Sequence, residues 1–202
     1  MSTLRERQKV QRHNRILDAA SALFREQGYE AVKMEAIAEA AEVSIGTIYN
    51  YYQNKGDLLV AIVSLEVEEV IKVGKHVIAK PPNNLQDAVD ELIGGYVQHS
   101  LKYLSKEMWR QAMAISTIQP ASPFGETYAA LDVALAQQTR ELLETLQELE
   151  ILSKSVDAAS LGEVIFNNTN MNFSNFVKSP KMTMTSLRKT LRRQHAAILA
   201  HL

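Results

Sequence analysis

The stretch SIGTIYNYYQNK, residues 44–55, collects side chains that form hydrogen bonds but carry no negative charge. Hydroxyls, amides and phenol rings alternate with small and apolar residues, and the first charged side chain after Ser44 is Lys55. Hydroxyl and amide groups bond base edges, while phenol hydroxyls and ammonium groups donate to phosphates. A carboxylate among them would repel phosphate. The composition therefore favours a surface that faces nucleic acid.

Two short predicted helices position these side chains. Residues 34–41 and 45–52 each have a short apolar face, and about three residues join them, which is the spacing of a helix-turn-helix. Ala38 suits the tight contact between the helices, Val43 packs in the turn, and Ser44 is a candidate N-cap. On a helical wheel, the inward arc holds Ile45, Ile48 and Tyr52, the outward arc holds Gly46, Thr47, Asn50 and Tyr51, and Tyr49 lies at the boundary.

The rest of the chain also shows helical periodicity. Apolar spacing predicts one helix from near Val10 to Gly28 and another from Lys55 towards Ile78. The two prolines at 81–82 cannot continue a helix, so they mark a linker. Five more helices are predicted at about 85–104, 106–118, 125–151, 157–178 and 182–201, with Ser105 and Ser155 as caps. The expected fold class is all-α, with about nine helices.

Composition narrows the functional classes. The 202 residues carry a net charge of −1, but the charges are unevenly distributed. Both ends are basic: residues 1–15 hold five basic side chains and one acid, and residues 180–202 hold five basic side chains and no acid. The middle is acidic, because residues 81–179 hold twelve acids and six basic side chains. The absence of cysteine rules out disulfides and thiolate metal sites. No His/Glu metal motif, phosphate loop or nucleophile elbow indicates an enzyme, a metal or a cofactor. The chain has neither the apolar segment of a signal peptide nor a run long enough to span a membrane, so we expect a soluble cytoplasmic protein.

One set of residues along the first sixty positions matches the pattern of a known family: Phe24, Gly28, Tyr29, Ile37, Ala38, Val43, Thr47, Tyr49, Lys55, Leu58 and Leu59. Through them, residues 10–60 resemble the N-terminal domain of the tetracycline-repressor (TetR) family of transcriptional regulators. Beyond residue 60 the resemblance covers only length and helical architecture. Glu42 departs from the family, which usually has glycine at this turn position; φ there is often positive, and a non-glycine residue costs on the order of 1 kcal/mol.

The resemblance implies a homodimer with a helix-turn-helix DNA-binding domain at residues 1–55 and a helical effector-binding and dimerisation domain at 56–202. Each subunit would place its third helix in a major groove of double-stranded DNA, so the expected operator is an inverted repeat. The basic residues at 5–15 would lie along phosphates or reach a minor groove. The last two helices would form a four-helix dimer interface, with Leu191 and Ile198 on its apolar stripe. The DNA-facing residues carried over by position are Ile45, Gly46, Thr47, Tyr49, Asn50, Tyr51 and Lys55.

Side chains of the second domain could line a small-molecule pocket. Tyr96, His99 and Tyr103 share one helix face and combine an apolar body with a polar tip, where leucine or valine would fill a plain core better. They could equally be core residues with satisfied hydrogen bonds. Asn168 and Asn172 face inward and need partners, which a pocket, a dimer contact or a partly wet face would supply. The predicted effector pocket comprises Tyr96, His99, Tyr103, Trp109, Met113, Asn168 and Asn172.

These patterns together predict a ligand-responsive DNA-binding regulator of transcription, a repressor that a small molecule releases from its operator. The acidic balance of residues 81–179 favours a neutral or cationic effector. The alternative is an architectural or cell-division DNA-binding protein without an effector. An enzyme is not expected.

Overall fold

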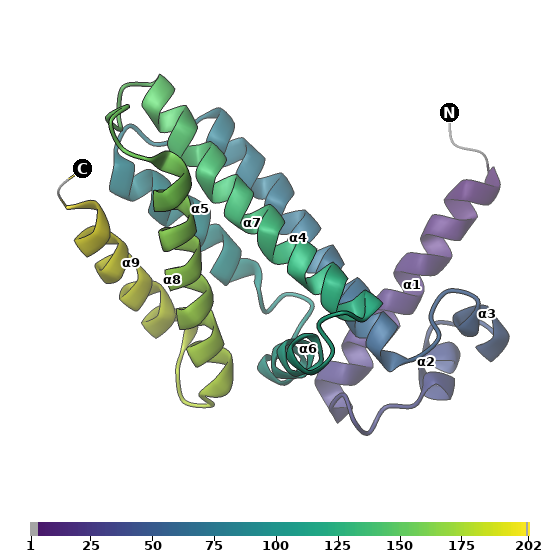
Figure 1. Ribbon diagram of the computed structural model, residues 1–202. Helices are drawn as coiled ribbons and strands as arrows, with labels where there is room; N and C mark the ends of the chain where they lie inside the picture. Colours follow the sequence, from purple (N-terminus) through teal and green to yellow (C-terminus); the bar gives the residue numbers. More distant parts are fainter. Residues whose placement is uncertain (1–3, 201) are drawn as a thin grey trace. The chain divides into compact units, whose positions relative to one another are not determined.

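The computed structural model describes residues 4–200 and 202. Within them the chain forms nine α-helices and no β-strand (Figure 1), which confirms the all-α class. None of these helices has both the length and the apolar character that crossing a bilayer requires. The helices are α1 (Leu4–Gln27), α2 (Met34–Ala40), α3 (Ile45–Tyr49), α4 (Lys55–Ala79), α5 (Leu85–His99), α6 (Lys106–Ile118), α7 (Pro123–Glu148), α8 (Ala158–Lys178) and α9 (Met184–Leu199).

Most helix boundaries lie within a few residues of their predicted places. The largest difference is at α1, which begins at Leu4 rather than near Val10, because the intervening arginine, glutamate, glutamine and lysine residues are good helix formers. At α8, Asp157 rather than Ser155 is the cap, since its carboxylate accepts hydrogen bonds from the backbone N–H groups of the first turn. Helices α3 and α5 end earlier than predicted, and α9 ends at Leu199; its predicted end at residue 201 lies outside the described residues.

The chain divides into two compact units. The first contains the described residues up to Leu65 together with Lys102–Tyr128, and the second contains Glu66–Leu101 and Ala129–Leu202. Helices α4 and α7 contribute residues to both units. The domain boundary that the sequence predicts after residue 55 stays a prediction about where the DNA-binding region ends.

The first unit is built on the buried face of α1. Ile16 and Phe24 lie at helical spacing and are shielded from solvent. Helix α2 adds Ile37 and Ala38, and α3 adds Ile48, all of them buried. Helix α2 contacts both α1 and α3, so the three helices share one core. Burial of large side chains such as these contributes roughly 1.5–3 kcal/mol each.

Helix α6 also belongs to the first unit. The hydroxyl of Ser21 on α1 donates to the carbonyl of Tyr103 at 2.5 Å, just before α6 begins. The carboxylate of Glu107 accepts a hydrogen bond from the backbone N–H of Tyr29 at 3.3 Å. Ser105 caps the helix, as its position in the sequence predicts. A segment far along the chain therefore completes the fold of the N-terminal helices.

In the second unit, α9 lies against α5 and α8 (Figure 1). Its buried stripe consists of Leu187, Leu191, His195 and Leu199. The expected role of Leu191 in a dimer interface is wrong, because its side chain is only 3% exposed within the single chain. Large apolar side chains remain exposed on α8 instead, where Val164 and Met171 lie two turns apart.

Two helical glycines provide a matched test of this packing. A Cβ at Gly162 of α8 would lie 3.1 Å from the Cα of Arg140 on α7, whereas a Cβ at Gly95 of α5 would meet nothing within 4 Å. Gly162→Ala should lower the free energy of unfolding, because two helix backbones must separate. Gly95→Ala should raise it by up to about 1 kcal/mol, the usual gain from replacing a helical glycine. Urea unfolding followed by circular dichroism measures both, and an equal gain in the two variants would contradict the close α7–α8 approach.

Candidate nucleic-acid interface

A four-residue turn, residues 41–44, joins α2 to α3 and has an unusual backbone. The N–H of Glu42 donates to the carbonyl of Glu39 at 3.1 Å, and the N–H of Val43 donates to the carbonyl of Ala38 at 3.0 Å. Glu42 has a φ of 54°, which confirms that this position requires the left-handed region although it is not glycine. Its carboxylate lies 3.7 Å from the guanidinium of Arg15, with both side chains exposed. The turn therefore fixes the direction in which α3 leaves α2.

Helix α3 is only five residues long and is held at two points. Ser44 is its N-cap, as predicted: the Ser44 hydroxyl oxygen accepts from the backbone N–H of Thr47 at 3.1 Å, and the two hydroxyls lie 2.8 Å apart. The second point is Ile48, whose side chain is fully buried on the inner side of α3. A cap contributes about 1 kcal/mol, so the cap and the buried side chain together hold a helix too short to be stable alone.

The outer face of α3 presents most of the predicted DNA-facing residues. Tyr49 is 49% exposed, and Gly46 and Asn50 are exposed beside it. Ile45 is also exposed, which corrects its expected place on the inward arc: it is the first residue of the helix, next to the turn. Thr47, whose hydroxyl forms a hydrogen bond with the hydroxyl of the N-cap Ser44, is half-buried. This exposed face holds hydroxyl, amide and phenol groups and no carboxylate.

The two tyrosines after α3 have different surroundings. Tyr52 is buried, and its hydroxyl lies 2.9 Å from Nδ1 of His13 on α1. Burial, followed by the neighbouring Tyr51, raises the pKa of Tyr52 well above its usual value. Tyr51 is half-buried, with its ring centroid 6.2 Å from that of Tyr52 and 6.3 Å from that of His13. Tyr52 thus serves the core, whereas Tyr51 keeps part of its surface free.

Lys55 begins α4 and bonds within the chain. Its ammonium donates to the carbonyls of Tyr29 and Glu30, each at 2.9 Å, and lies 4.9 Å from the centroid of the Tyr29 ring. Burial, followed by the charges of Glu30 and Asp57, raises the pKa of Tyr29 to about 12. An ammonium group has three donors, so these two bonds leave one for an external anion. The predicted DNA contact of Lys55 stays a prediction, beside a structural role that the sequence did not indicate.

The first turns of α1 carry the predicted basic segment. These residues belong to a regular helix rather than to an irregular arm. Arg5, Lys9 and Arg12 follow the i, i+4, i+7 spacing of one helix face, and all three are exposed. A row of cations along one face is suited to a phosphate backbone.

Known proteins resemble this chain in sequence or in fold. Residues 16–62 match the sequence model of the bacterial regulatory proteins of the tetR family. The HTH-type transcriptional repressor KstR from Rhodococcus jostii is 34% identical over 136 residues, which cover 67% of this chain and 58% of that repressor. A putative TetR-family regulator from Mesorhizobium loti has a TM-score of 0.75 at 19% identity, covering 98% of each chain. Thermus thermophilus FadR, solved in complex with lauroyl-CoA, has a TM-score of 0.65 at 19% identity over 94% of each chain.

Residues 16–62 place the chain in the TetR family. The match to the family covers the turn, all of α2 and α3, and the start of α4. The chain spans 58% of the length of the KstR repressor, and the solved relatives, at 19% identity, establish the fold alone.

Four predicted effector residues of this TetR-family chain lie in the second unit. The hydroxyl of Tyr96 donates to the side-chain oxygen of Gln138 at 2.7 Å. The ring of His99 bonds to Glu66 through Nδ1 and lies 3.2 Å from Glu69 through Nε2. The amides of Asn168 and Asn172 both donate to the side-chain oxygen of Gln194 on α9, at 2.9 and 2.7 Å. The two asparagines are therefore brought together, and their shared partner belongs to the same chain.

The other three predicted effector residues lie in the first unit. Trp109 is buried, and Met113 and Tyr103 are half-buried. Tyr103 also accepts the hydrogen bond from Ser21 through its backbone carbonyl. That all seven residues line one cavity stays a prediction.

Three polar partners of these residues are not predicted by the sequence pattern. Glu66 and Gln138 are buried and Gln194 is half-buried, each on a helix face that otherwise turns apolar residues inward. Gln138 uses both ends of its amide, because its nitrogen donates to the carbonyl of Ile71 on α4 at 2.8 Å. The sequence signal for such a partner is a polar residue at a helical position that the apolar spacing places inward.

The carboxyl group of Asp132, on α7, should make the free energy of unfolding depend on pH. Burial raises the pKa of Asp132 to about 6, although a hydrogen bond from Asn170 acts in the opposite direction. The unfolded chain would titrate near 3.9. Between about pH 4 and pH 6 the folded state therefore binds more protons, so its free energy of unfolding should fall as pH rises through this window.

Asp132→Asn should remove that fall. Urea unfolding at pH 4, 5, 6 and 7 should show the variant gaining stability relative to the parent as pH rises, with the difference levelling off above about pH 6. Asp18→Asn, which removes an exposed carboxylate from α1, controls for the loss of one negative charge. Parallel stability profiles for Asp132→Asn and the parent would contradict the raised pKa.

Proposed function

We propose that this chain is a DNA-binding regulator of transcription, a repressor that a small molecule releases from its operator. The observation that supports this most directly is the exposed, acid-free face of α3, fixed by the Glu42 turn, the Ser44 cap and the burial of Ile48. Hydroxyl and amide groups on a rigid helix can bond base edges, and such a helix fits a major groove. A regulator of this kind would act in the cytoplasm, in contact with the chromosome.

The proposed repressor is a homodimer. Val164 and Met171 expose large apolar surfaces on one side of α8, and a second copy would cover them. A two-fold dimer presents two α3 helices, so its operator would be an inverted repeat with half-sites about 34–36 Å apart. The basic face of α1 would add phosphate contacts outside each half-site.

Gly46→Ala tests the DNA-binding face without disturbing the fold. A Cβ at Gly46 would meet only the Ser44 hydroxyl oxygen, at an ordinary 3.9 Å, so the chain itself does not require glycine there. The variant should unfold at the same or a higher temperature. Its operator affinity should nevertheless fall by on the order of 1–3 kcal/mol, because the added methyl would occupy space that the bases need. Fluorescence anisotropy on the selected inverted repeat measures the affinity.

Two further variants sharpen this test. Gly95→Ala is the matched glycine control and should leave operator affinity unchanged. Tyr49→Phe removes one exposed hydroxyl and should weaken binding to specific and unrelated DNA alike, as expected for a phosphate contact. If Gly46→Ala and Tyr49→Phe both bind the operator like the parent protein, α3 does not read DNA.

The effector is proposed to act through α4, which starts beside α3 and continues into the second unit. A ligand held by that unit would shift α4 and change the separation of the two α3 helices in the dimer. This is a population shift between dimers that fit the operator and dimers that do not. The acidic balance of residues 81–179 favours a neutral or cationic ligand, whereas FadR was solved with an anionic acyl thioester, lauroyl-CoA.

Release of the operator tests the effector. Lauroyl-CoA and neutral dodecanol are the first probes, and one of them should both raise the melting temperature and lower operator affinity. Tyr96→Phe and Asn172→Leu should bind the operator like the parent but no longer release it. If no ligand changes operator affinity, the chain is a DNA-binding protein without an effector; loss of folding in both variants would assign Tyr96 and Asn172 to packing.

A further inference from the structure

A groove of about 500 Å³ lies between α5 and α9, within the second unit. This volume is in the range of small-molecule sites. Its apolar wall comes from Ile93, Val97, Met184 and Leu191. None of the predicted effector residues lines it. The groove is therefore a different place from the pocket that the sequence suggests.

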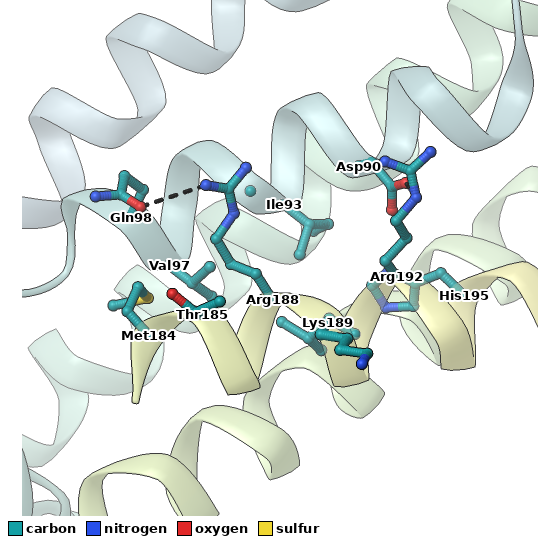
Figure 2. Close-up of a pocket in the computed structure, with 12 residues that line it drawn as sticks. Asp90, Ile93, Val97, Gln98, Met184, Thr185, Arg188, Lys189, Arg192 and His195 are labelled. Carbon is teal, nitrogen blue, oxygen red and sulfur yellow. Dashed lines mark hydrogen bonds and ion pairs between the residues drawn. The ribbon is translucent and has the colours of Figure 1, made fainter. Parts of the chain in front are cut away.

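Cationic side chains stand at both ends of the groove. Figure 2 shows Arg188 and Arg192 projecting from α9 toward α5, one beside Gln98 and the other beside Asp90. Arg192 is neutralised, because its guanidinium lies 3.3 Å from Asp90 and 3.5 Å from Asp87. Arg188 makes only a long contact of 3.5 Å with the neutral amide of Gln98. Within the described part of the chain, neither Arg188 nor the adjacent Lys189 has an ion-pair partner.

A glycine keeps the groove open beneath Arg188. Gly94 lines the groove, and a Cβ there would lie 3.7 Å from the guanidinium of Arg188. Gly94 and Gly95 sit side by side inside α5, where each costs about 1 kcal/mol relative to alanine. At Gly94 the missing side chain leaves space directly under an unpaired cation, whereas the surroundings of Gly95 are open in any case.

His195 contributes an unsatisfied acceptor to the groove wall. Its Nε2 lies 3.4 Å from the hydroxyl oxygen of Thr169, and that hydroxyl already donates to the carbonyl of Ile165 at 2.8 Å. Nε2 must therefore carry the proton, and Nδ1 holds a lone pair. Burial lowers the pKa of His195, with Asp90 acting in the opposite direction, so the ring is neutral near pH 7. Nδ1 is buried and has no hydrogen-bond partner among the described residues.

We propose that this groove binds a small organic anion with an apolar body. Its carboxylate or phosphate group would bond Arg188 and Lys189, and its apolar part would lie on Ile93, Val97 and Leu191. Arginine and lysine both bind these anions, and the bond is stronger beside an apolar wall than in open water. The site goes beyond the proposed function, because binding here does not depend on whether the chain reads DNA.

Titration of the full-length protein, without DNA, tests the site. Octanoate, octyl phosphate and neutral octanol share one alkyl chain and differ in the head group. Calorimetry should give a dissociation constant roughly tenfold or more lower for at least one anion than for octanol, since a bond to a charged group contributes about that factor. The amide signal of Gly94 in a ¹⁵N-labelled sample should move during the titration. The tighter of the two anions identifies the head group as carboxylate or phosphate.

Matched variants locate the binding. Arg188→Gln should weaken anion binding about tenfold, while Arg193→Gln, on the same helix but outside the groove, should not. Gly94→Leu should fill the groove and abolish binding, while Gly95→Leu should preserve it. Equal binding of octanol and the anions would overturn the charge requirement. Unchanged anion binding in Arg188→Gln, or in a folded Gly94→Leu variant, would overturn the location. Operator affinity of the same variants is measured separately, so failure of this site leaves the proposed regulator intact.

Discussion

The burial of Ile48 is the constraint on which the exposed face of α3 depends. A five-residue helix has too few internal hydrogen bonds to persist in water, so packing has to hold it. Ile48 supplies that packing, and its direction is set by a turn in which Glu42 accepts a left-handed backbone. Because Ile48 points inward, Gly46, Tyr49 and Asn50 are forced outward. The chemistry of the proposed DNA-binding face is thus a geometric consequence of one buried side chain.

The second unit is organised by a different rule, in which polar side chains join helices. Gln138 accepts from Tyr96 on α5 and donates to the carbonyl of Ile71 on α4, so one amide links three helices. Gly74 makes room for it, because a Cβ there would lie 2.2 Å from the side-chain oxygen of Gln138. Buried amides paired in this way fix which helices are neighbours, since any other arrangement would leave costly unpaired groups. The polar tips that suggest a pocket therefore also serve the architecture.

Local signals in the sequence were sufficient for the helices and for the turn. Prolines at 81–82, the cap at Ser44 and the departure at Glu42 each act within a few residues, so their effects could be predicted without knowing the fold. The partners of buried polar groups could not be predicted in this way. Periodicity indicates that Asn168 faces inward, but only the packing of α9 on α8 brings Gln194 to it. For the same reason the sequence places Leu191 in a dimer contact: its stripe is apolar, and the pattern does not reveal that α9 packs against α5 and buries it.

The distribution of charge carries more information than its sum. A net charge of −1 arises from a basic α1, an acid-free α3, an acidic middle and a basic α9. Screening limits the reach of each charge to about 10 Å at moderate salt, so distant acids do not cancel a local cation. The acidic middle of the chain therefore does not determine what α9 can bind. Arg192 is neutralised by two aspartates that lie within 3.5 Å, whereas Arg188, one turn away, faces an amide and a glycine. The ligand charge that a site favours is therefore determined by the side chains within a few Å of the ligand, and not by the net charge of the chain.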